Sequence, residues 1–188
     1  MTTTPNIRTT PMPEAMHLLL ADYPRDDWSG HPNFKRSTEQ WLGAHQMFRR
    51  LSALVRTDAE AFLDKNQDAG NYAARLGHFG NLLVANLHGH HHWEDRSYFP
   101  ELAAADPRFE AGLEVLEQDH AALDGILDTF TRQANRVIKL VQLDEAAARE
   151  EAAMVHQGAA QIETLLTRHL GDEEDLAVPI ILHHKLRG

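Results

Sequence analysis

The sequence contains two histidine–glutamate pairs with the same spacing, His90 with Glu94 and His169 with Glu173. Four residues advance an α-helix by about 400°, so the two side chains of each pair point in nearly one direction about one turn apart. One imidazole and one carboxylate can then reach a common metal ion. A proline stands ten residues after each of the two histidines. A chance pair would not be expected to repeat the proline that follows it.

Two further histidines complete the pattern. His45 lies 45 residues before His90, and His120 lies 49 residues before His169. Each half of the chain therefore reads as a histidine followed by His-x-x-x-Glu. This repeat predicts a site with pseudo-twofold symmetry and two metal ions.

The neighbours of these histidines are apolar with a helical period, as Leu116 and Leu123 are around His120. Buried polar groups are costly without partners, and metal ions are the simplest partners for six of them. The six expected ligands are His45, His90, Glu94, His120, His169 and Glu173.

The ligand types narrow the choice of metal. Imidazole and carboxylate without thiolate suit iron, manganese or zinc, and two bridging carboxylates in a helical protein favour a dinuclear redox pair. We expect two iron ions, with manganese or zinc as alternatives. His45 and His90 would serve one ion, His120 and His169 the other, and the two glutamates would bridge them. Open positions would remain for an oxo or hydroxo bridge and for a small diatomic or peroxide ligand.

The elements that hold these residues are predicted to be helices. Ala, Leu, Glu, Gln and Arg dominate, and alternating β-branched runs are absent, so the fold should be all-α. Helices are expected at about 33–66, 72–104, 107–141 and 144–185, with Asn33, Asn71 and Asp144 as caps and with bends at Pro100 and Pro179. The short connections favour an up-down-up-down four-helix bundle over residues 34–188. Residues 1–33 carry five of the eight prolines and should form an N-terminal arm or cap.

The composition excludes several classes of function. The 188 residues carry a formal net charge of −10, which disfavours nucleic acid and anionic membranes as partners. The absence of cysteine excludes disulfides, thiolate metal sites and cysteine nucleophiles. No apolar run is long enough to span a bilayer, so we expect a cytoplasmic protein. The sequence does not indicate a protein partner.

Two segments resemble the hemerythrin-like HHE family of cation-binding domains. The run HHHWEDRSYFP, from His90 to Pro100, is similar to the family's second-helix motif, and HLGDEEDLAVP, from His169 to Pro179, is similar to its fourth-helix motif. The resemblance covers about residues 35–185. It implies a four-helix bundle with a non-haem di-iron centre that binds or senses oxygen, nitric oxide or peroxide, or that handles iron.

The chain also departs from the oxygen-carrying members of that family. Where they have a second histidine on the third helix, this chain has Asp124. Where they have an aspartate five residues after the last histidine, this chain has Glu174, just past the better-placed Glu173. These departures favour a reactive or sensing centre over simple oxygen carriage. We expect Asp124 to pair with Arg49 behind the ligand histidines, with Asp124 as a direct ligand as the alternative.

Three neighbouring histidines, His88, His91 and His92, are expected on other faces of the second helix, as solvated or inter-helix residues. The register leaves other pairs with four-residue spacing, namely His91 with Asp95 and His88 with His92, and these histidines could form an additional metal site. The proline spacing favours His90 with Glu94.

Two other functions remain as alternatives. A ferritin-like di-iron oxidase or iron-handling protein would need Glu-x-x-His on two helices, and only Glu117-x-x-His120 fits. A zinc-bound or metal-free helical interaction module is the other. Weak redox turnover is compatible with the first interpretation but not required by it, so the sequence leaves open whether the protein is an enzyme.

Overall fold

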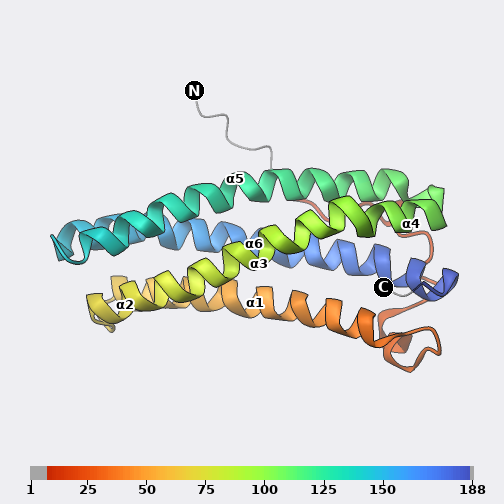
Figure 1. Ribbon diagram of the computed structural model, residues 1–188, viewed down its shortest axis with the longest axis horizontal. Coiled ribbons are helices and arrows are strands. Elements are labelled where there is room, and N and C mark those ends of the chain that lie inside the picture. The colour runs from red at the N-terminus through yellow and green to blue at the C-terminus, as the bar shows by residue number, and fades with distance from the viewer. Residues whose placement is uncertain (1–7, 187–188) are drawn as a thin grey trace.

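The computed structural model describes residues 8–186, and within that range the chain consists of helices and turns without strands (Figure 1). The prediction of an all-α protein is therefore confirmed. The α-helices are α1 (Arg36–Leu63), α2 (Ala69–Arg75), α3 (Asn81–Trp93), α4 (Phe99–Ala105), α5 (Glu110–Leu140) and α6 (Glu145–His184). Two π-helical segments, η3 (Leu76–Gly80) and η4 (Glu94–Tyr98), join α2, α3 and α4 into one continuous helical stretch.

The long helices lie side by side and share one interior (Figure 1). Helix α6 packs against both α1 and α5, and α3 also contacts both of them. Side chains from α1, α3, α5 and α6 can therefore meet at the same level. This arrangement is what a site built from all four segments requires.

The helix ends differ in detail from the predicted caps. Asp144 caps α6 as expected, since its side chain accepts a hydrogen bond from the Ala147 amide. Asp68, rather than Asn71, caps α2. Asn33 does not cap α1, because its side-chain amide instead donates to the Leu182 carbonyl at 2.8 Å and ties the start of the first helix to the end of α6.

The two prolines at which bends were expected lie in different positions. Pro179 lies within α6. Pro100 stands in the first turn of α4, directly after the π-helical segment Glu94–Tyr98. A proline lacks the N–H that an α-helix needs and clashes with the preceding turn, and a wider turn relieves both problems. The predicted interruption at Pro100 is thus a π turn, and it begins at the proposed ligand Glu94.

The buried polar residues separate two hydrophobic clusters. On α5, Leu116 belongs to one cluster and Leu123 to the other, with buried His120 between them. On α6, Leu170 and Leu176 flank buried Glu173 in the same way. The polar side chains therefore form a layer across the interior, with a dry core on each side.

The N-terminal arm, described here from residue 8 to residue 35, contains two 3₁₀ turns, η1 (Glu14–Met16) and η2 (Arg25–Gly30). Its side chains Met12, Leu19 and Trp28 are buried in the same cluster as residues of α5 and α6. The arm is therefore packed onto the helices.

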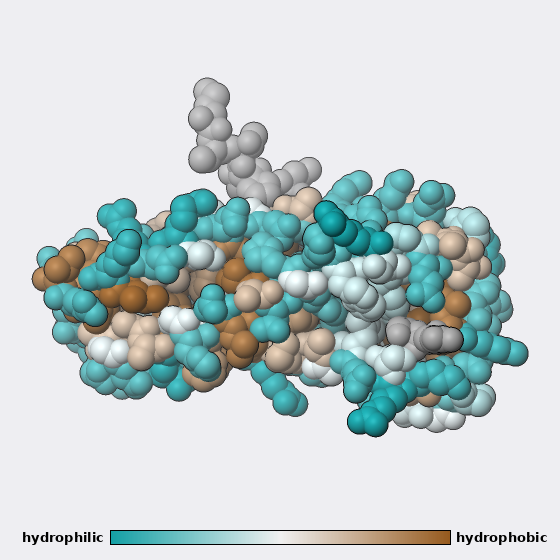
Figure 2. Space-filling model, in the orientation of Figure 1, coloured by the Kyte–Doolittle hydropathy of each residue, from teal (hydrophilic) through white to brown (hydrophobic). Residues whose placement is uncertain are grey.

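Among the described residues, each helix is either too short or too polar to cross a lipid bilayer. Hydrophilic residues cover most of the face shown in Figure 2, and the hydrophobic residues that appear there are more frequent toward the end that holds α2.

Candidate metal centre

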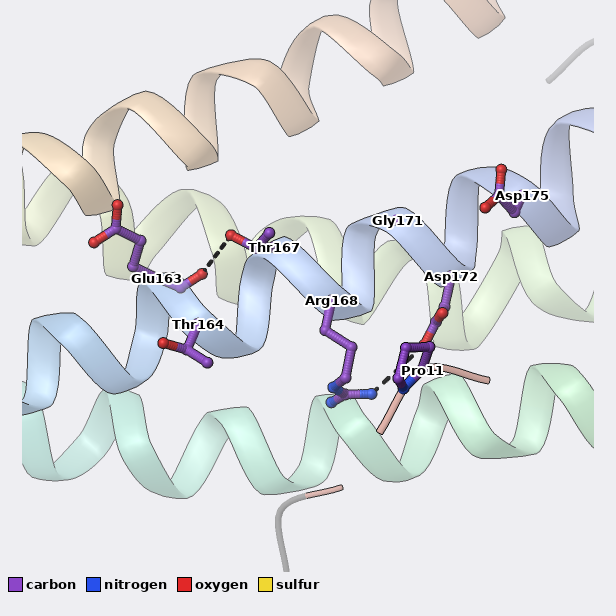
Figure 3. A pocket seen from close by; sticks show the side chains of 8 residues that line it. All are labelled: Pro11, Glu163, Thr164, Thr167, Arg168, Gly171, Asp172 and Asp175. Atoms are coloured by element: carbon purple, nitrogen blue, oxygen red, sulfur yellow. Dashed lines mark hydrogen bonds and ion pairs between the residues drawn. The ribbon is translucent and has the colours of Figure 1, made fainter. Parts of the chain in front are cut away.

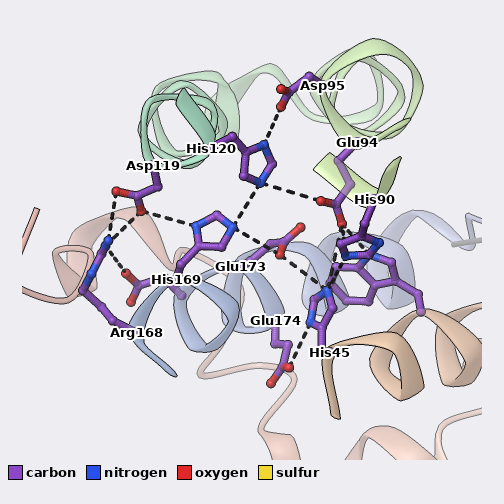
Figure 4. Close-up of polar contacts among 12 residues, drawn as sticks. His45, His90, Glu94, Asp95, Asp119, His120, Arg168, His169, Glu173 and Glu174 are labelled. Carbon is purple, nitrogen blue, oxygen red and sulfur yellow. Dashed lines mark hydrogen bonds and ion pairs between the residues drawn. The ribbon is translucent and has the colours of Figure 1, made fainter. Parts of the chain in front are cut away.

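Two groups of potential metal ligands lie in the polar layer (Figure 4). The first group consists of His45 on α1, His90 on α3, Glu94 at the start of η4 and Glu173 on α6. The second group consists of His91 on α3, His120 on α5 and His169 on α6. The structure therefore brings together all six residues that the spacing predicted, and adds one.

The first group is compact. The Nε2 atoms of His45 and His90 lie 3.0 Å apart, and Oε1 of Glu94 is 2.9 Å from Nε2 of His90. Oε2 of Glu173 is 3.6 Å from Nε2 of His45. Neighbouring ligands of one ion with bonds of about 2.1 Å stand about 3 Å apart or slightly more. These separations fit a single cation.

The second group has an equivalent pair of facing histidines, with the glutamates farther away. The Nε2 atoms of His120 and His169 lie 3.0 Å apart. Oε2 of Glu94 is 3.7 Å from Nε2 of His120, and Oε2 of Glu173 is 3.8 Å from Nε2 of His169. Each glutamate thus lies between the two groups. Glu94 turns one oxygen toward each group, which is the arrangement a bridging carboxylate needs.

His91 lies on another face of α3 from His90, and of the positions expected from the sequence it takes the inter-helix one. It is only 2% exposed, and its ring stacks on His120 with centroids 4.0 Å apart. Neither of its ring nitrogens has a hydrogen-bond partner. Burial lowers the pKa of His91 well below its ordinary value, and His120 and His169 lower it further. A neutral imidazole with unpartnered nitrogens is available as a ligand.

Three of the histidines are held from behind by carboxylates. Nδ1 of His45 lies 3.0 Å from Glu174, Nδ1 of His120 lies 2.6 Å from Asp95, and Nδ1 of His169 lies 3.3 Å from Asp119. An ionised carboxylate only accepts hydrogen bonds, so each Nδ1 must carry the proton. When the imidazole is neutral, its Nε2 is then unprotonated, with the lone pair directed into the site.

This tautomer assignment has a consequence for His120 and His169. Their two Nε2 atoms face each other at 3.0 Å, and when both imidazoles are neutral the two lone pairs repel unless a cation lies between them. A histidine whose Nδ1–H is held by a carboxylate is the usual form of a metal-bound imidazole. The pair therefore fits a metal ion better than it fits a hydrogen bond.

The glutamates lead to the same conclusion. Oε2 of Glu94 and both carboxylate oxygens of Glu173 are buried without a hydrogen-bond partner. Burial raises the pKa of Glu173 well above its ordinary value, and the nearby Glu94 charge raises it further. Unpartnered buried carboxylates are costly, and cations shared by both would remove that cost.

Glu94 has an additional fixed contact. The Trp41 indole N–H donates to Oε1 of Glu94 at 2.7 Å. Burial by itself would raise the pKa of Glu94, but the neighbouring His45 and His90 imidazoles outweigh it and hold the pKa well below the ordinary value. Glu94 is therefore held ionised and in one orientation.

Arg49 and Asp124, the pair expected behind the ligand histidines, each have a different partner. Arg49 donates to Oε1 of Glu174 at 2.8 Å, the same oxygen that faces His45. Oδ1 of Asp124 lies 3.0 Å from Nδ1 of His88, and the Asp124 side chain is 51% exposed. Arg49 thus acts on the site through Glu174 rather than through Asp124.

The remaining nearby histidines are more exposed. His92 is exposed and His88 partly so. Asp95, the alternative partner of His91 in the slipped register, contacts Nδ1 of His120 instead. A sign that pointed to His91 was present in the sequence, since His91 stands within three adjacent histidines before Glu94, while Asp124 stands where oxygen carriers have a second histidine on the third helix.

One comparison with known proteins gives a match. The family model of the hemerythrin HHE cation-binding domain matches residues 36–181, which include all seven side chains of the two groups. Comparisons with curated proteins and with solved structures give no match.

Proposed function

We propose that this chain, which belongs to the hemerythrin HHE cation-binding domain family, holds two iron ions within an up-down-up-down four-helix bundle and binds or senses a small oxidant. The first ion would be held by His45 and His90, and the second by His120 and His169 together with His91. Glu94 and Glu173 would bridge the two. Such a pair of ions supplies reversible ligand binding and electron transfer to oxygen, nitric oxide or peroxide.

The observation that carries the proposal is the facing of the His120 and His169 Nε2 atoms across 3.0 Å in a buried layer. Their Nδ1 atoms are bound to carboxylates, so neither histidine can relieve the contact by changing tautomer without losing a hydrogen bond. Iron is favoured among the candidate metals because two shared carboxylates and several imidazoles form a site for a dinuclear redox pair.

We assign the small ligand to the first ion. The first group offers two imidazoles where the second offers three. His90 is also the only member of the two groups that is not fully buried, with 9% of its side chain exposed. Fewer protein ligands and nearer solvent favour exchange at that position.

His91 alters one argument from the sequence. Asp124 replaces a histidine that oxygen carriers have, which weighed against oxygen carriage. Because His91 supplies a third imidazole to the same group from another helix, the absence of a second histidine on the third helix no longer argues against oxygen binding. We therefore propose oxygen, nitric oxide and peroxide as equally suitable ligands.

The ferritin-like alternative loses support from Glu117, the glutamate of its one matching motif. This residue is exposed, whereas His120 is buried in the site. Zinc in place of iron remains the alternative that the ligand types allow.

Metal analysis tests the proposal. Protein purified without a His-affinity column should contain about two irons per chain. Its absorption spectrum should show an oxo- or hydroxo-bridge band that changes when peroxide or nitric oxide is added. One zinc per chain, or no metal, would contradict the proposal. A spectrum that does not change when either peroxide or nitric oxide is added would contradict only the proposal that the centre binds a small oxidant.

A further inference from the structure

Two arginines of the N-terminal arm reach the carboxylates behind the ligand histidines. Arg8 donates to Oδ2 of Asp119 at 2.6 Å, and Arg25 donates to Oε2 of Glu174 at 2.9 Å. Both carboxylates are buried, at 4% exposure each. The arm thus contacts one carboxylate behind each group, although it lies outside the matched residues 36–181.

The contacts of Arg25 with Glu174 and of Arg8 with Asp119 follow the same pattern in the two groups. Glu174 accepts from Arg49 of α1 and from Arg25 of the arm while it holds His45. In the second group, Asp119 accepts from Arg168 of α6 and from Arg8 of the arm while it holds His169. Each carboxylate therefore has one arginine from the helices and one from the arm.

The arm is also held in this position by Met12, next to the Asp172 carboxylate that Arg8 contacts at 2.7 Å. The Met12 amide donates to Oδ2 of Asp172 at 3.0 Å, and the Met12 side chain is 3% exposed. It lies against Gly112 of α5, where an added Cβ would stand 3.6 Å from the Met12 sulfur and would clash with Leu176. The absence of a side chain at Gly112 makes room for Leu176 of α6, and Met12 of the arm packs at an ordinary contact distance beside it.

Solvent reaches the outer side of this contact. A hollow of about 570 Å³ runs along α6 and is lined by Pro11 of the arm together with Arg168, Gly171 and Asp172 (Figure 3). Arg8 and Arg168 line a neighbouring hollow. The arm therefore stands between solvent and Asp119, the carboxylate that holds His169.

We propose that the arm is a strap that secures the metal ions through Arg8 and Arg25, which act as positioning residues. The inference rests on the proposed metal centre. A carboxylate that holds a metal-binding imidazole must itself be held in place, and its loss of orientation weakens metal binding. Arg8 secures the second ion through Asp119 and His169, and Arg25 secures the first ion through Glu174 and His45.

Metal release to a chelator tests the strap. Iron-loaded Arg8→Gln protein should release one ion per chain about tenfold faster than the unaltered protein, and the other ion at the unaltered rate. Arg25→Gln should accelerate release of the other ion, and the double variant should accelerate both. Mössbauer spectra of ⁵⁷Fe-loaded protein should show one altered iron environment in each single variant.

Two controls separate positioning from general loosening. Arg75→Gln removes an arginine that pairs with Asp58 of α1, a residue outside both groups, and should leave release rates and spectra unchanged. Arg8→Lys restores the charge but not the forked geometry, and should recover part of the lost retention. The arm should stay docked in each variant, because Met12, Leu19 and Trp28 are unaltered.

The outcomes distinguish the two proposals. Absence of iron in the unaltered protein would overturn both. Two irons with unaltered release and spectra in Arg8→Gln and Arg25→Gln would overturn the strap alone. Equal acceleration of both ions by either single variant would overturn the assignment of one arginine to each ion.

Discussion

The two ligand groups have the same sequence pattern, but they differ in imidazole number and in burial. The group with His45 and His90 has two imidazoles, and one of these is partly exposed. The group with His120 and His169 gains buried His91 as a third. A repeated motif therefore gives two candidate metal positions with different surroundings, and under the proposed function one suits exchange of an outside ligand and the other suits retention of its ion.

The difference arises from the position of α3 between two neighbours. Adjacent residues on an α-helix point about 100° apart. His90 faces His45 of α1, and His91 faces His120 of α5. One helix thus serves both groups with consecutive side chains, and Glu94 contributes to both.

The largest effect on metal content is expected from substitution of Glu94, which lies between the two groups. Glu94→Gln should remove both ions, because Glu94 turns one oxygen toward each group and glutamine offers only one neutral oxygen. Metal content and the loss of the bridge absorption measure this. Glu101→Gln, at an exposed position on α4, is the control and should retain both ions. Loss of a single ion would show that Glu94 does not bridge.

The next largest effect on metal binding is expected from substitution of His91, and it should be limited to the second group. His91→Ala should weaken binding of the second ion by at least about tenfold and leave the first in place. A chelator titration would measure this. His92→Ala changes the exposed neighbour and should have no effect. If His91→Ala left both ions bound as before, His91 would be a packing residue and the two groups would be alike.

A pH titration tests whether burial keeps His169 of the second group neutral in the folded protein. Burial lowers the pKa of His169 to about 4, against the opposing hydrogen bond to Asp119. An unfolded histidine titrates near pH 6.5, so between about pH 6.5 and 4 the unfolded chain binds a proton that the folded chain does not. His169 should therefore lower the stability of metal-free protein by up to about 3 kcal/mol as the pH falls through this range.

Chemical denaturation of metal-free protein at several pH values tests this expectation. The comparison is with His169→Asn, which lacks the titrating group and should lose less stability toward pH 4. Parallel pH profiles for the two proteins would mean that His169 is not held neutral in the folded state.

The smallest expected effect concerns Asp124. Asp124→Ala should change the free energy of unfolding by no more than about 0.5 kcal/mol, because the side chain is half exposed and contacts only His88 among the partners found for it. Metal content and spectrum should be unchanged. Loss of the second ion would instead make Asp124 a ligand, and would weaken the assignment of that position to His91.

The sequence predicted the helical class and the meeting of six polar residues, because helical spacing decides which side chains share a face. His90 with Glu94 and His169 with Glu173 are one turn apart, and any helix of this length places them together. The family match over residues 36–181 confirms the resemblance that these motifs indicated.

What the sequence could not predict depended on contacts between distant segments. His91 lies on a different face of the helix from His90, as expected, but spacing within the helix could not show that this face also meets the polar layer, because α3 has two neighbours. The partners of Arg49 and the contacts of Arg8 and Arg25 join residues 111 to 149 positions apart. Spacing within one helix carries no information about such pairs.

The π turn at Glu94–Tyr98 has a consequence for any attempt to transplant the centre into a designed bundle of regular helices. A π turn is an α-helix with one residue inserted, and each residue rotates the helix by about 100°. A straight helix with the same sequence would keep His90, His91 and Glu94 in place but would turn Tyr98, Phe99 and Leu102 away from the core that now buries them. The part of the helix that carries the candidate ligands and the part that follows the π turn are therefore rotated relative to each other by the extra residue. A design that copies the ligand spacing must copy this extra residue as well.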